Sequence, residues 1–190
     1  MPTTYSIAVP KKKLKNPPLK VNKLGDRVLR QPAKKISKVN DEIRSLAVKM
    51  LQTMYSNDGI GLAAPQVGVN KQLIVIDIEL KDESKPPLVM INPEIISLGG
   101  AIVLGEEGCL SVPEVFLDVQ RPDEVTVTYR DEEGRPQKLS TNGLLARVIQ
   151  HEMDHLNGVM FVDRAQNAIA LNKELSKHGF SAKDVQSIKD

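Results

Sequence analysis

The segment GLLARVIQHEMDHLNG, residues 143–158, constrains the fold more than any other part of the chain. Polar residues at 140–142 precede it as candidate caps, and Gly158 is a natural stop. Its apolar residues occupy more than one side of a helix, and a helix that is apolar over most of its surface must be buried. We therefore predict a central helix. The apolar positions are Leu144, Leu145, Val148, Ile149, Met153 and Leu156.

The same segment carries two histidines four residues apart, His151 and His155, with Glu152 directly after the first. Residues with this spacing differ by about 40° around a helix, so the two rings lie side by side and can share one cation. Glu152 points away from that line, which suits a neighbour of the metal that handles the proton of a bound water. Two imidazoles do not complete such a site, because a catalytic zinc usually has three protein ligands and an open position.

Two residues are candidates for the third ligand. Glu174 follows His155 at nearly the offset at which thermolysin-like metalloproteases supply a glutamate. Cys109 lies in the segment EEGCLSVP after Gly108, whose missing side chain lets the backbone approach a metal or ligand closely. A lone cysteine is more often a small buried hydrophobe. The residues alone leave this choice open.

Periodicity and turn residues predict the other elements and an α+β class. Asn40 is a candidate N-cap for a helix over 40–58, and Asp163 for a weaker C-terminal helix over 163–179. The segment GIGLAAPQVGV reads as extended and tightly turning. β-branched runs with no helix between them indicate antiparallel strands. These strands are expected at 72–80, 87–95 and 100–107, and in a hairpin over 123–140.

Composition favours a single soluble domain. Hydrophobic residues make up 41% of the 190 residues and charged residues 26%, which is ordinary for a globular protein. No apolar run reaches the roughly eighteen residues of a membrane helix, and no secretory signal is recognisable. The single cysteine suits a reducing compartment. We expect a cytoplasmic protein that binds neither membrane nor specific DNA.

The positive charge is concentrated at the N-terminus. Residues 1–38 carry 11 Lys and Arg against one acid, whereas 39–190 carry 15 against 23. Residues 1–23 are proline-containing and lack periodicity, so we predict a basic, solvated and flexible extension. Transient contact with ribosomal RNA is the less favoured interpretation. We divide the chain into this extension, a catalytic domain over 24–165, and a C-terminal helix and tail over 166–190.

Three segments resemble the signature motifs of the peptide deformylases, in the family's order and with comparable separations. They are GIGLAAPQ, EGCLS and QHEMDHLNG, at 59–66, 107–111 and 150–158. The resemblance covers roughly residues 24–165. It implies an α+β fold in which antiparallel sheets surround the helix that carries the histidines. It also implies removal of the N-formyl group from the formylmethionine of new polypeptides, with release of formate.

The resemblance makes Cys109, His151 and His155 the metal ligands, with water in the fourth position. Such a cation lowers the pKa of water toward about 7 and so provides a nucleophile at neutral pH. Glu152 accepts the proton and returns it to the leaving amine. Ligands of this kind suit zinc, cobalt, nickel or ferrous iron. The family implies Fe²⁺ in the cell, for which Zn²⁺, Ni²⁺ or Co²⁺ can substitute.

The resemblance also assigns residues to the substrate. The side-chain amide of Gln66 and the backbone N–H of Leu110 stabilise the oxyanion that forms from the formyl oxygen. The first motif, with Gly108 opposite, binds the peptide as an added strand. Leu144, Val148 and the aliphatic stem of Glu107 line the methionine pocket. The substrate-binding residues are thus Gly59, Ile60, Gly61, Glu107, Gly108, Leu144 and Val148.

One residue departs from the family pattern, and two other functions compete with the deformylase hypothesis. Phe116 stands where some members carry an arginine that closes the cleft, which leaves the peptide preference beyond the methionine open.

The enzyme alternative is a zincin-type endopeptidase with Glu174 as third ligand. The other alternative is a non-enzymatic metal-binding or RNA-binding module, motivated by the basic extension.

Overall fold

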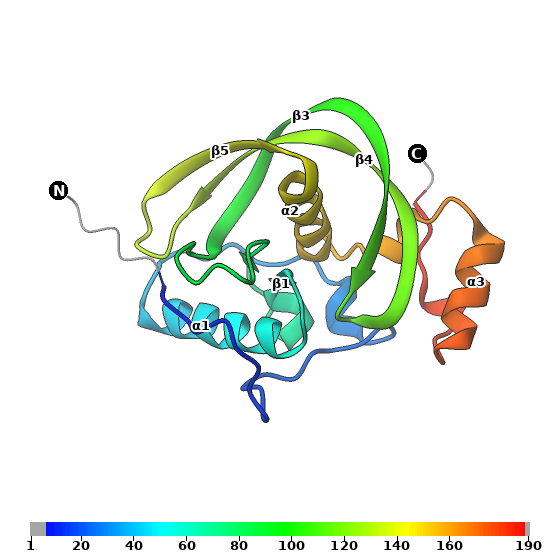
Figure 1. Ribbon diagram of the computed structural model, residues 1–190, viewed down its shortest axis with the longest axis horizontal. Coiled ribbons are helices and arrows are strands. Elements are labelled where there is room, and N and C mark those ends of the chain that lie inside the picture. The colour runs from blue at the N-terminus through cyan, green and yellow to red at the C-terminus, as the bar shows by residue number, and fades with distance from the viewer. Residues whose placement is uncertain (1–6, 189–190) are drawn as a thin grey trace.

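Five antiparallel strands form one sheet, in the order β1-β2-β3-β4-β5, in the computed structural model, which describes residues 7–188 (Figure 1). The α+β class and the antiparallel pairing are confirmed, although the strands form one sheet and not several. The strands are β1 (Gly61–Ala63), β2 (Leu73–Ile76), β3 (Leu88–Cys109), β4 (Val112–Arg130) and β5 (Pro136–Asn142). The helices of more than one turn are α1 (Asp41–Ser56), α2 (Gly143–Leu156) and α3 (Ala168–Lys177).

Strand β2 is buried on both faces between α1 and α2. Leu73 and Val75 join the hydrophobic cluster of α1, whereas Ile74 and Ile76 join that of α2. Side chains alternate between the two faces of a strand, so burial of both faces requires the continuous apolar run LIVI. This strand fixes the helix that carries the histidines against the body of the domain.

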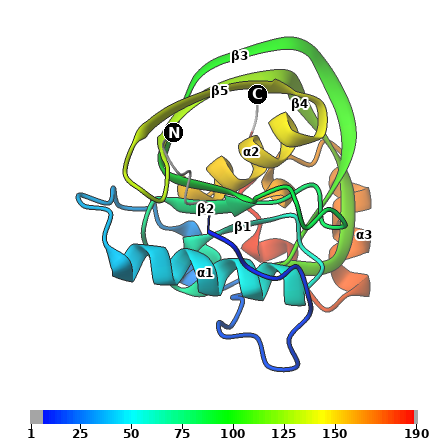
Figure 2. The ribbon, with the colours of Figure 1, turned by 60° about the vertical axis from the view of Figure 1, so that its left-hand side comes forward.

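Helix α2 lies beneath the arch formed by β3, β4 and β5 (Figure 2). It contacts β1, β2, β4 and β5, as its wide apolar surface requires. The helix ends before Gly158, whose φ of 73° lies in the left-handed region. A Cβ at Gly158 would also collide with the backbone of Arg30. The prediction that the helix stops at Gly158 is therefore confirmed. A separate observation is that no helix within residues 7–188 is long and apolar enough to cross a membrane.

Strands β3 and β4 form one long hairpin, whereas the sequence predicted shorter strands. The segments 87–95 and 100–107 belong to a single bent strand, and the first half of β4 was missed. Register shifts interrupt the pairing, for example between Gly99 and Ile102. Bulges bend a strand and increase its twist. The hairpin can therefore curve over α2 and end at Cys109 beside the site.

The helix caps confirm one prediction and correct another. The side chain of Asn40 accepts a hydrogen bond from Ile43 N at 3.1 Å, as an N-cap should. Asp163 does not cap the C-terminal helix, because α3 begins after Asn167. Asp163 instead accepts hydrogen bonds from the guanidinium of Arg30 and from Met160 N. Asp163 therefore bonds to the backbone just before it and to a distant arginine, and not to the start of α3.

Residues 7–23 contain no helix or strand and lie along α1, with most of these residues exposed, and the flexibility expected from the sequence stays a prediction. Val9 and Val21 are buried. The ammonium group of Lys11 is 2.8 Å from Asp77 Oδ2, and both side chains are almost fully buried. At the end of the segment, Asn22 donates its backbone N–H to Gln66 O. Residues 1–6 lie outside the described part of the chain.

Candidate metal centre and cleft

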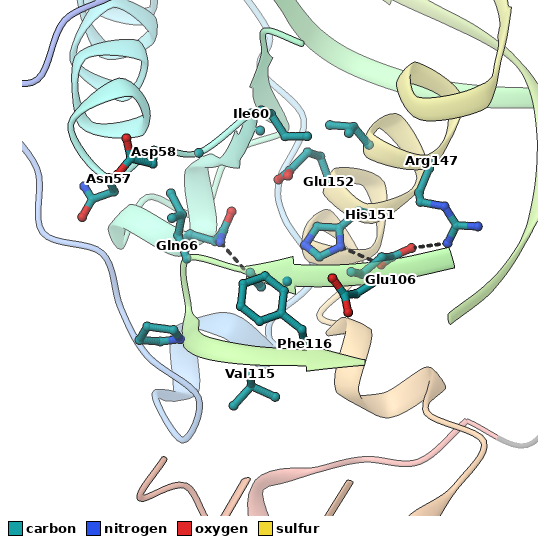
Figure 3. Close-up of a pocket in the computed structure, with 18 of the residues that line it drawn as sticks. Asn57, Asp58, Ile60, Gln66, Glu106, Val115, Phe116, Arg147, His151 and Glu152 are labelled. Carbon is teal, nitrogen blue, oxygen red and sulfur yellow. Dashed lines mark hydrogen bonds and ion pairs between the residues drawn. The ribbon is translucent and has the colours of Figure 1, made fainter. Parts of the chain in front are cut away.

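Helix α2 places the two histidines and the glutamate of the third motif at the base of a cleft. His151, Glu152 and His155 are all buried. The rings of His151 and His155 have centroids 5.0 Å apart and stand edge to face. Figure 3 shows the side chains of His151 and Glu152 beside Gln66. The i, i+4 spacing therefore brings both imidazoles to one site.

The β3–β4 hairpin brings Cys109 to the same site. Cys109 ends β3 and pairs with Val112 across a two-residue turn. Its sulfur is 3.3 Å from His155 Nε2. One potential ligand atom from each of Cys109, His151 and His155 lies within 4.8 Å of the other two. A thiolate and two imidazoles at this spacing can converge on one divalent ion.

Glu174 does not reach this cluster. It lies on α3, where its carboxylate is 3.8 Å from His178 Nε2 and 3.9 Å from Lys177 Nζ. The third ligand-type side chain beside the two histidines is Cys109. The thermolysin-like alternative is therefore not favoured, because the offset along the chain did not place Glu174 near His155.

Glu107 orients one of the two imidazoles. Its Oε2 is 2.9 Å from His151 Nδ1, an arrangement that puts the proton on Nδ1 and leaves Nε2 free to bind a metal. Burial alone would raise the pKa of Glu107, but its hydrogen bonds to Arg121 and His151 and their charges outweigh burial and hold the pKa well below its usual value. Glu107 is therefore ionised. Its charge is compensated in the interior by ion pairs with Arg121, Arg147 and His151.

The pKa values of the two histidines are shifted in opposite directions. Burial lowers the pKa of His155 well below its usual value, and the charge of His151 acts in the same direction. Burial would also lower the pKa of His151, but its hydrogen bonds to Cys109 and Glu107 outweigh burial and raise that pKa. His155 is thus neutral, as a metal ligand must be, whereas His151 would have to release its Nε2 proton when a cation binds. The negative groups around His151 favour a positive charge at this place, which is what a bound cation supplies.

Glu152 has the properties of an acid–base group. Burial raises its pKa to about 7, and the positive charge of His151 offsets this only in part. Among the described residues, Oε2 of Glu152 has no hydrogen-bond partner although it is buried. A carboxyl group with a pKa near the working pH can both accept and donate a proton.

Gln66 faces Cys109 with a fixed amide orientation. Its Oε1 accepts a hydrogen bond from Ala63 N at 2.9 Å. Its Nε2 donates to Ser111 Oγ at 3.1 Å and to Cys109 Sγ at 3.4 Å. Because the oxygen is held by the backbone, the amide nitrogen points toward the cleft and the sulfur. Leu110 follows Cys109 in the turn and also lines the cleft.

The cleft has a volume of about 470 Å³ and is lined by most of the predicted site residues. His155 lies beneath its surface, while the other predicted residues form its lining. These are Gly59, Ile60, Gly61, Gln66, Glu107, Gly108, Cys109, Leu110, Leu144, Val148, His151 and Glu152. Phe116, the residue that departs from the family pattern, covers Gly108 at the same cleft, because a Cβ at Gly108 would collide with its ring.

The sequence analysis missed three charged residues around the site. Arg147 lines the cleft and donates to the carboxylate of Glu107 and to the carbonyls of Val103 and Val119. Arg121 is buried between Glu107 and Asp154. Arg147 could have been found from its spacing, because it precedes His151 by four residues on α2. The pairing of Arg121 with Asp154 had no local signal.

Comparison with known proteins identifies the family to which the chain is similar. The family model for polypeptide deformylase matches residues 18–170. The chain is 62% identical over 182 residues to the peptide deformylase of Microchaete diplosiphon, with 96% of this chain and 97% of that protein covered. It is 63% identical to peptide deformylase 1 of Nostoc, at 96% and 97% coverage.

Solved structures give the same result for the fold. The crystal structure of a peptide deformylase from Synechococcus elongatus in complex with actinonin superposes with a TM-score of 0.95. It is 62% identical, and the alignment covers 96% of this chain and 100% of that one. The peptide deformylase of Thermotoga maritima, at 39% identity, superposes with a TM-score of 0.74 over 78% of this chain and 98% of its own. The chain therefore belongs to the peptide deformylase family, hydrolases that act on N-formylmethionyl peptides.

Proposed function

We propose that the chain removes the formyl group from the formylmethionine of newly made polypeptides by using Cys109, His151 and His155 as ligands of one divalent metal. The observation that carries the proposal is the convergence of these three side chains within 4.8 Å beside Glu152. The hydrogen bond from His151 to Glu107 supports it, because metal-binding histidines usually donate their second nitrogen to a carboxylate or carbonyl.

Fe²⁺ is the metal that we propose for the cell, with Zn²⁺, Ni²⁺ or Co²⁺ as substitutes. One thiolate and two neutral imidazoles suit all four ions, so availability decides among them. When bound, the ion supplies Lewis acidity, which lowers the pKa of water and polarises a carbonyl group. Metal analysis of protein purified without oxygen tests the choice of ion, and a zinc content equal to the protein concentration with no iron would contradict it.

Glu152 is the proton carrier in this proposal. Its carboxylate takes the proton of the attacking water and transfers it to the amine that leaves as the formyl C–N bond breaks. Its buried position next to His151 and its pKa of about 7 support this role. General acid–base catalysis of this kind contributes about 10²–10⁴-fold.

Gln66 and Leu110 stabilise the negative charge that develops on the formyl oxygen. The bond from Ala63 N–H orients the amide of Gln66 so that its Nε2 faces Cys109 Sγ, and the formyl oxygen would replace one of the two contacts that Nε2 makes with Ser111 Oγ and Cys109 Sγ. The backbone N–H of Leu110 is the second donor in this proposal. Donors that are already oriented act most strongly where water is excluded.

The peptide backbone pairs with β1 in this proposal. Within residues 7–188, β1 is at the edge of the sheet and pairs with β2 alone. Ile60 and Gly61 line the cleft on one side and Gly108 on the other, and the carbonyl of Ile60 already accepts from Asp77 N–H. Pairing through backbone groups depends little on side chains, which suits an enzyme that acts on many new chains.

The methionine side chain enters the pocket lined by Leu144, Val148 and the stem of Glu107 in this proposal. Val148 is buried, and Leu144 is exposed at the cleft. Both precede His151 on α2, so the pocket is placed next to the metal ligands. This spacing would bring the formyl group of a bound formylmethionine close to the ligands.

Formate release from formyl-Met-Ala by the metal-loaded protein tests the function. Glu152→Ala should abolish release while the bound metal is retained. No formate release by the metal-loaded wild-type protein would contradict the proposal.

Metal content separates this site from the endopeptidase alternative. We expect Cys109→Ala to lose the metal and Glu174→Ala to keep it. The reverse result would support the endopeptidase, and retention of stoichiometric metal by Cys109→Ala would exclude the proposed ligand set.

A further inference from the structure

Three residues at the end of the basic N-terminal segment and the start of the catalytic domain, Asn22–Lys23–Leu24, contact both of the chain segments that carry the proposed oxyanion donors. Asn22 donates its backbone N–H to Gln66 O at 2.7 Å and its side-chain amide to the same oxygen at 3.2 Å. Leu24 is buried and donates its N–H to Ser111 O at 2.9 Å. The tripeptide therefore links the loop of Gln66 to the turn that follows Cys109.

Lys23 adds a charged contact to the same turn. Its ammonium group donates to the carbonyl oxygen of Leu110 at 2.7 Å. Hydrogen bonds from charged donors are stronger than neutral ones. Burial lowers the pKa of Lys23, and a negative charge on Cys109 would act in the opposite direction. Lys23 is nevertheless an exposed residue, so removal of its ammonium group leaves the core unchanged.

The carbonyl of Leu110 belongs to the same peptide group as the N–H of Ser111. That N–H donates to Cys109 Sγ at 3.4 Å. A donor that binds the carbonyl oxygen polarises the peptide group and makes its N–H a better donor. A continuous chain of two hydrogen bonds therefore connects the Lys23 ammonium to the Cys109 sulfur through the Leu110–Ser111 peptide.

We propose that Lys23 is a positioning residue that holds the Leu110–Ser111 peptide and thereby strengthens the hydrogen bond from Ser111 N–H to the Cys109 sulfur. Asn22 and Leu24 keep Lys23 in place through their bonds to Gln66 and Ser111. The inference rests on the proposed function in one respect, that Cys109 is a metal ligand. It adds that a lysine in the basic N-terminal segment tunes this ligand.

The electronic consequence can be measured on the thiolate. A hydrogen bond to a thiolate withdraws electron density from the sulfur, so charge transfer from sulfur to metal requires more energy. Co²⁺ is the probe of choice, because its complexes with thiolates absorb through such a transition and the proposed ligand set accepts this ion. Loss of the contact from Lys23 should shift the band to longer wavelength.

The test compares Lys23→Met, which keeps the length of the side chain but removes the donor, with Lys23→Arg, which restores a charged donor. The control is Lys20→Met, at an exposed lysine of the same segment. We expect the band of Co²⁺-loaded Lys23→Met to move to longer wavelength. The bands of Lys23→Arg and Lys20→Met should stay close to that of the wild-type protein.

Kinetics provide a second measurement. The Lys23→Met protein should show kcat lowered by about two- to tenfold, the size expected for loss of one hydrogen bond, with KM nearly unchanged. A band and a kcat equal to those of the wild-type protein would overturn the inference and leave the proposed function intact. Absence of the thiolate band in the wild-type protein would overturn the metal ligand itself, and the inference with it.

Discussion

Gly61 lies against the carboxylate of Glu152. A Cβ at Gly61 would overlap Oε1 of Glu152 and lie 3.0 Å from Val148 Cγ1. The missing side chain in the first motif therefore leaves room for the proposed acid–base group of the third. This contact explains why β1 begins with a glycine, at the position that faces Glu152 on α2.

Replacement of this glycine should disable the site without removing the ligands. We expect Gly61→Ala to lower kcat/KM for formyl-Met-Ala by about 10²-fold or more, because displacement of a catalytic group by 1 Å costs that much. Metal content should stay at the wild-type level, and both are measured on the same preparation. Gly99→Ala is the matched control, since a Cβ there makes only ordinary contacts with Glu124. Equal losses in the two variants would contradict the role assigned to the Gly61–Glu152 contact.

Gln66 should act on the transition state and not on the metal. Removal of one oxyanion donor costs about 2.7–4 kcal/mol, or roughly 10²–10³ in kcat. We expect Gln66→Ala to show this loss in steady-state kinetics while the metal content is retained, because no metal ligand is removed. Gln31→Ala, in which the affected amide lies outside the cleft, should match the wild-type protein. An unchanged kcat in Gln66→Ala would disprove the oxyanion role.

The sequence predicted helices more accurately than the long hairpin, for physical reasons. Asn40 and Gly158 act on backbone groups close in sequence, so local chemistry determined where α1 begins and α2 ends. Gly99 and Gly100 look like the end of a strand, but a bulge lets β3 continue through them. Bulge and turn have the same composition, and only pairing with β4 distinguishes them.

The proposed metal ligands were also easier to predict from the sequence than the charged residues around them. The two histidines were recognisable because a helix fixes their spacing, and Cys109 was identified by resemblance. Arg121 was missed because its partners, Glu107 and Asp154, come from other parts of the chain. Asp163 was misassigned for a similar reason, since its main partner is the distant Arg30.

Glu107 should make stability dependent on pH in the acid range. Its pKa in the folded protein is held well below the value of an unfolded glutamate, which is about 4.3. The folded state therefore favours the ionised form, and this stabilisation is complete above the unfolded pKa and decreases as the pH falls toward the folded pKa. We expect the unfolding free energy of the wild-type protein to fall between about pH 5 and pH 3.

The comparison that isolates this effect is Glu107→Gln against Glu106→Gln, at the exposed neighbouring position. Glu107→Gln should lose part of the dependence on pH, whatever its stability at neutral pH, while Glu106→Gln should keep the wild-type slope. Denaturant titrations at several pH values give the slopes. The same slope in all three proteins would show that Glu107 is not the titrating group.

Phe116 should influence which peptides bind. Phe116 is 56% exposed, and its ring covers Gly108 at the cleft, next to the proposed path of the peptide beyond the methionine. Contact with an aliphatic side chain there is worth about 1 kcal/mol, since burial of one methylene contributes about 0.8 kcal/mol. Phe116→Ala should therefore raise KM about fivefold for formyl-Met-Leu peptides, by the conversion of 1.4 kcal/mol per factor of ten. Formyl-Met-Asp peptides, measured in parallel, should change little in KM, and kcat should stay constant for both. An equal rise in KM for both peptides would mean that the ring shapes the cleft without selecting among side chains.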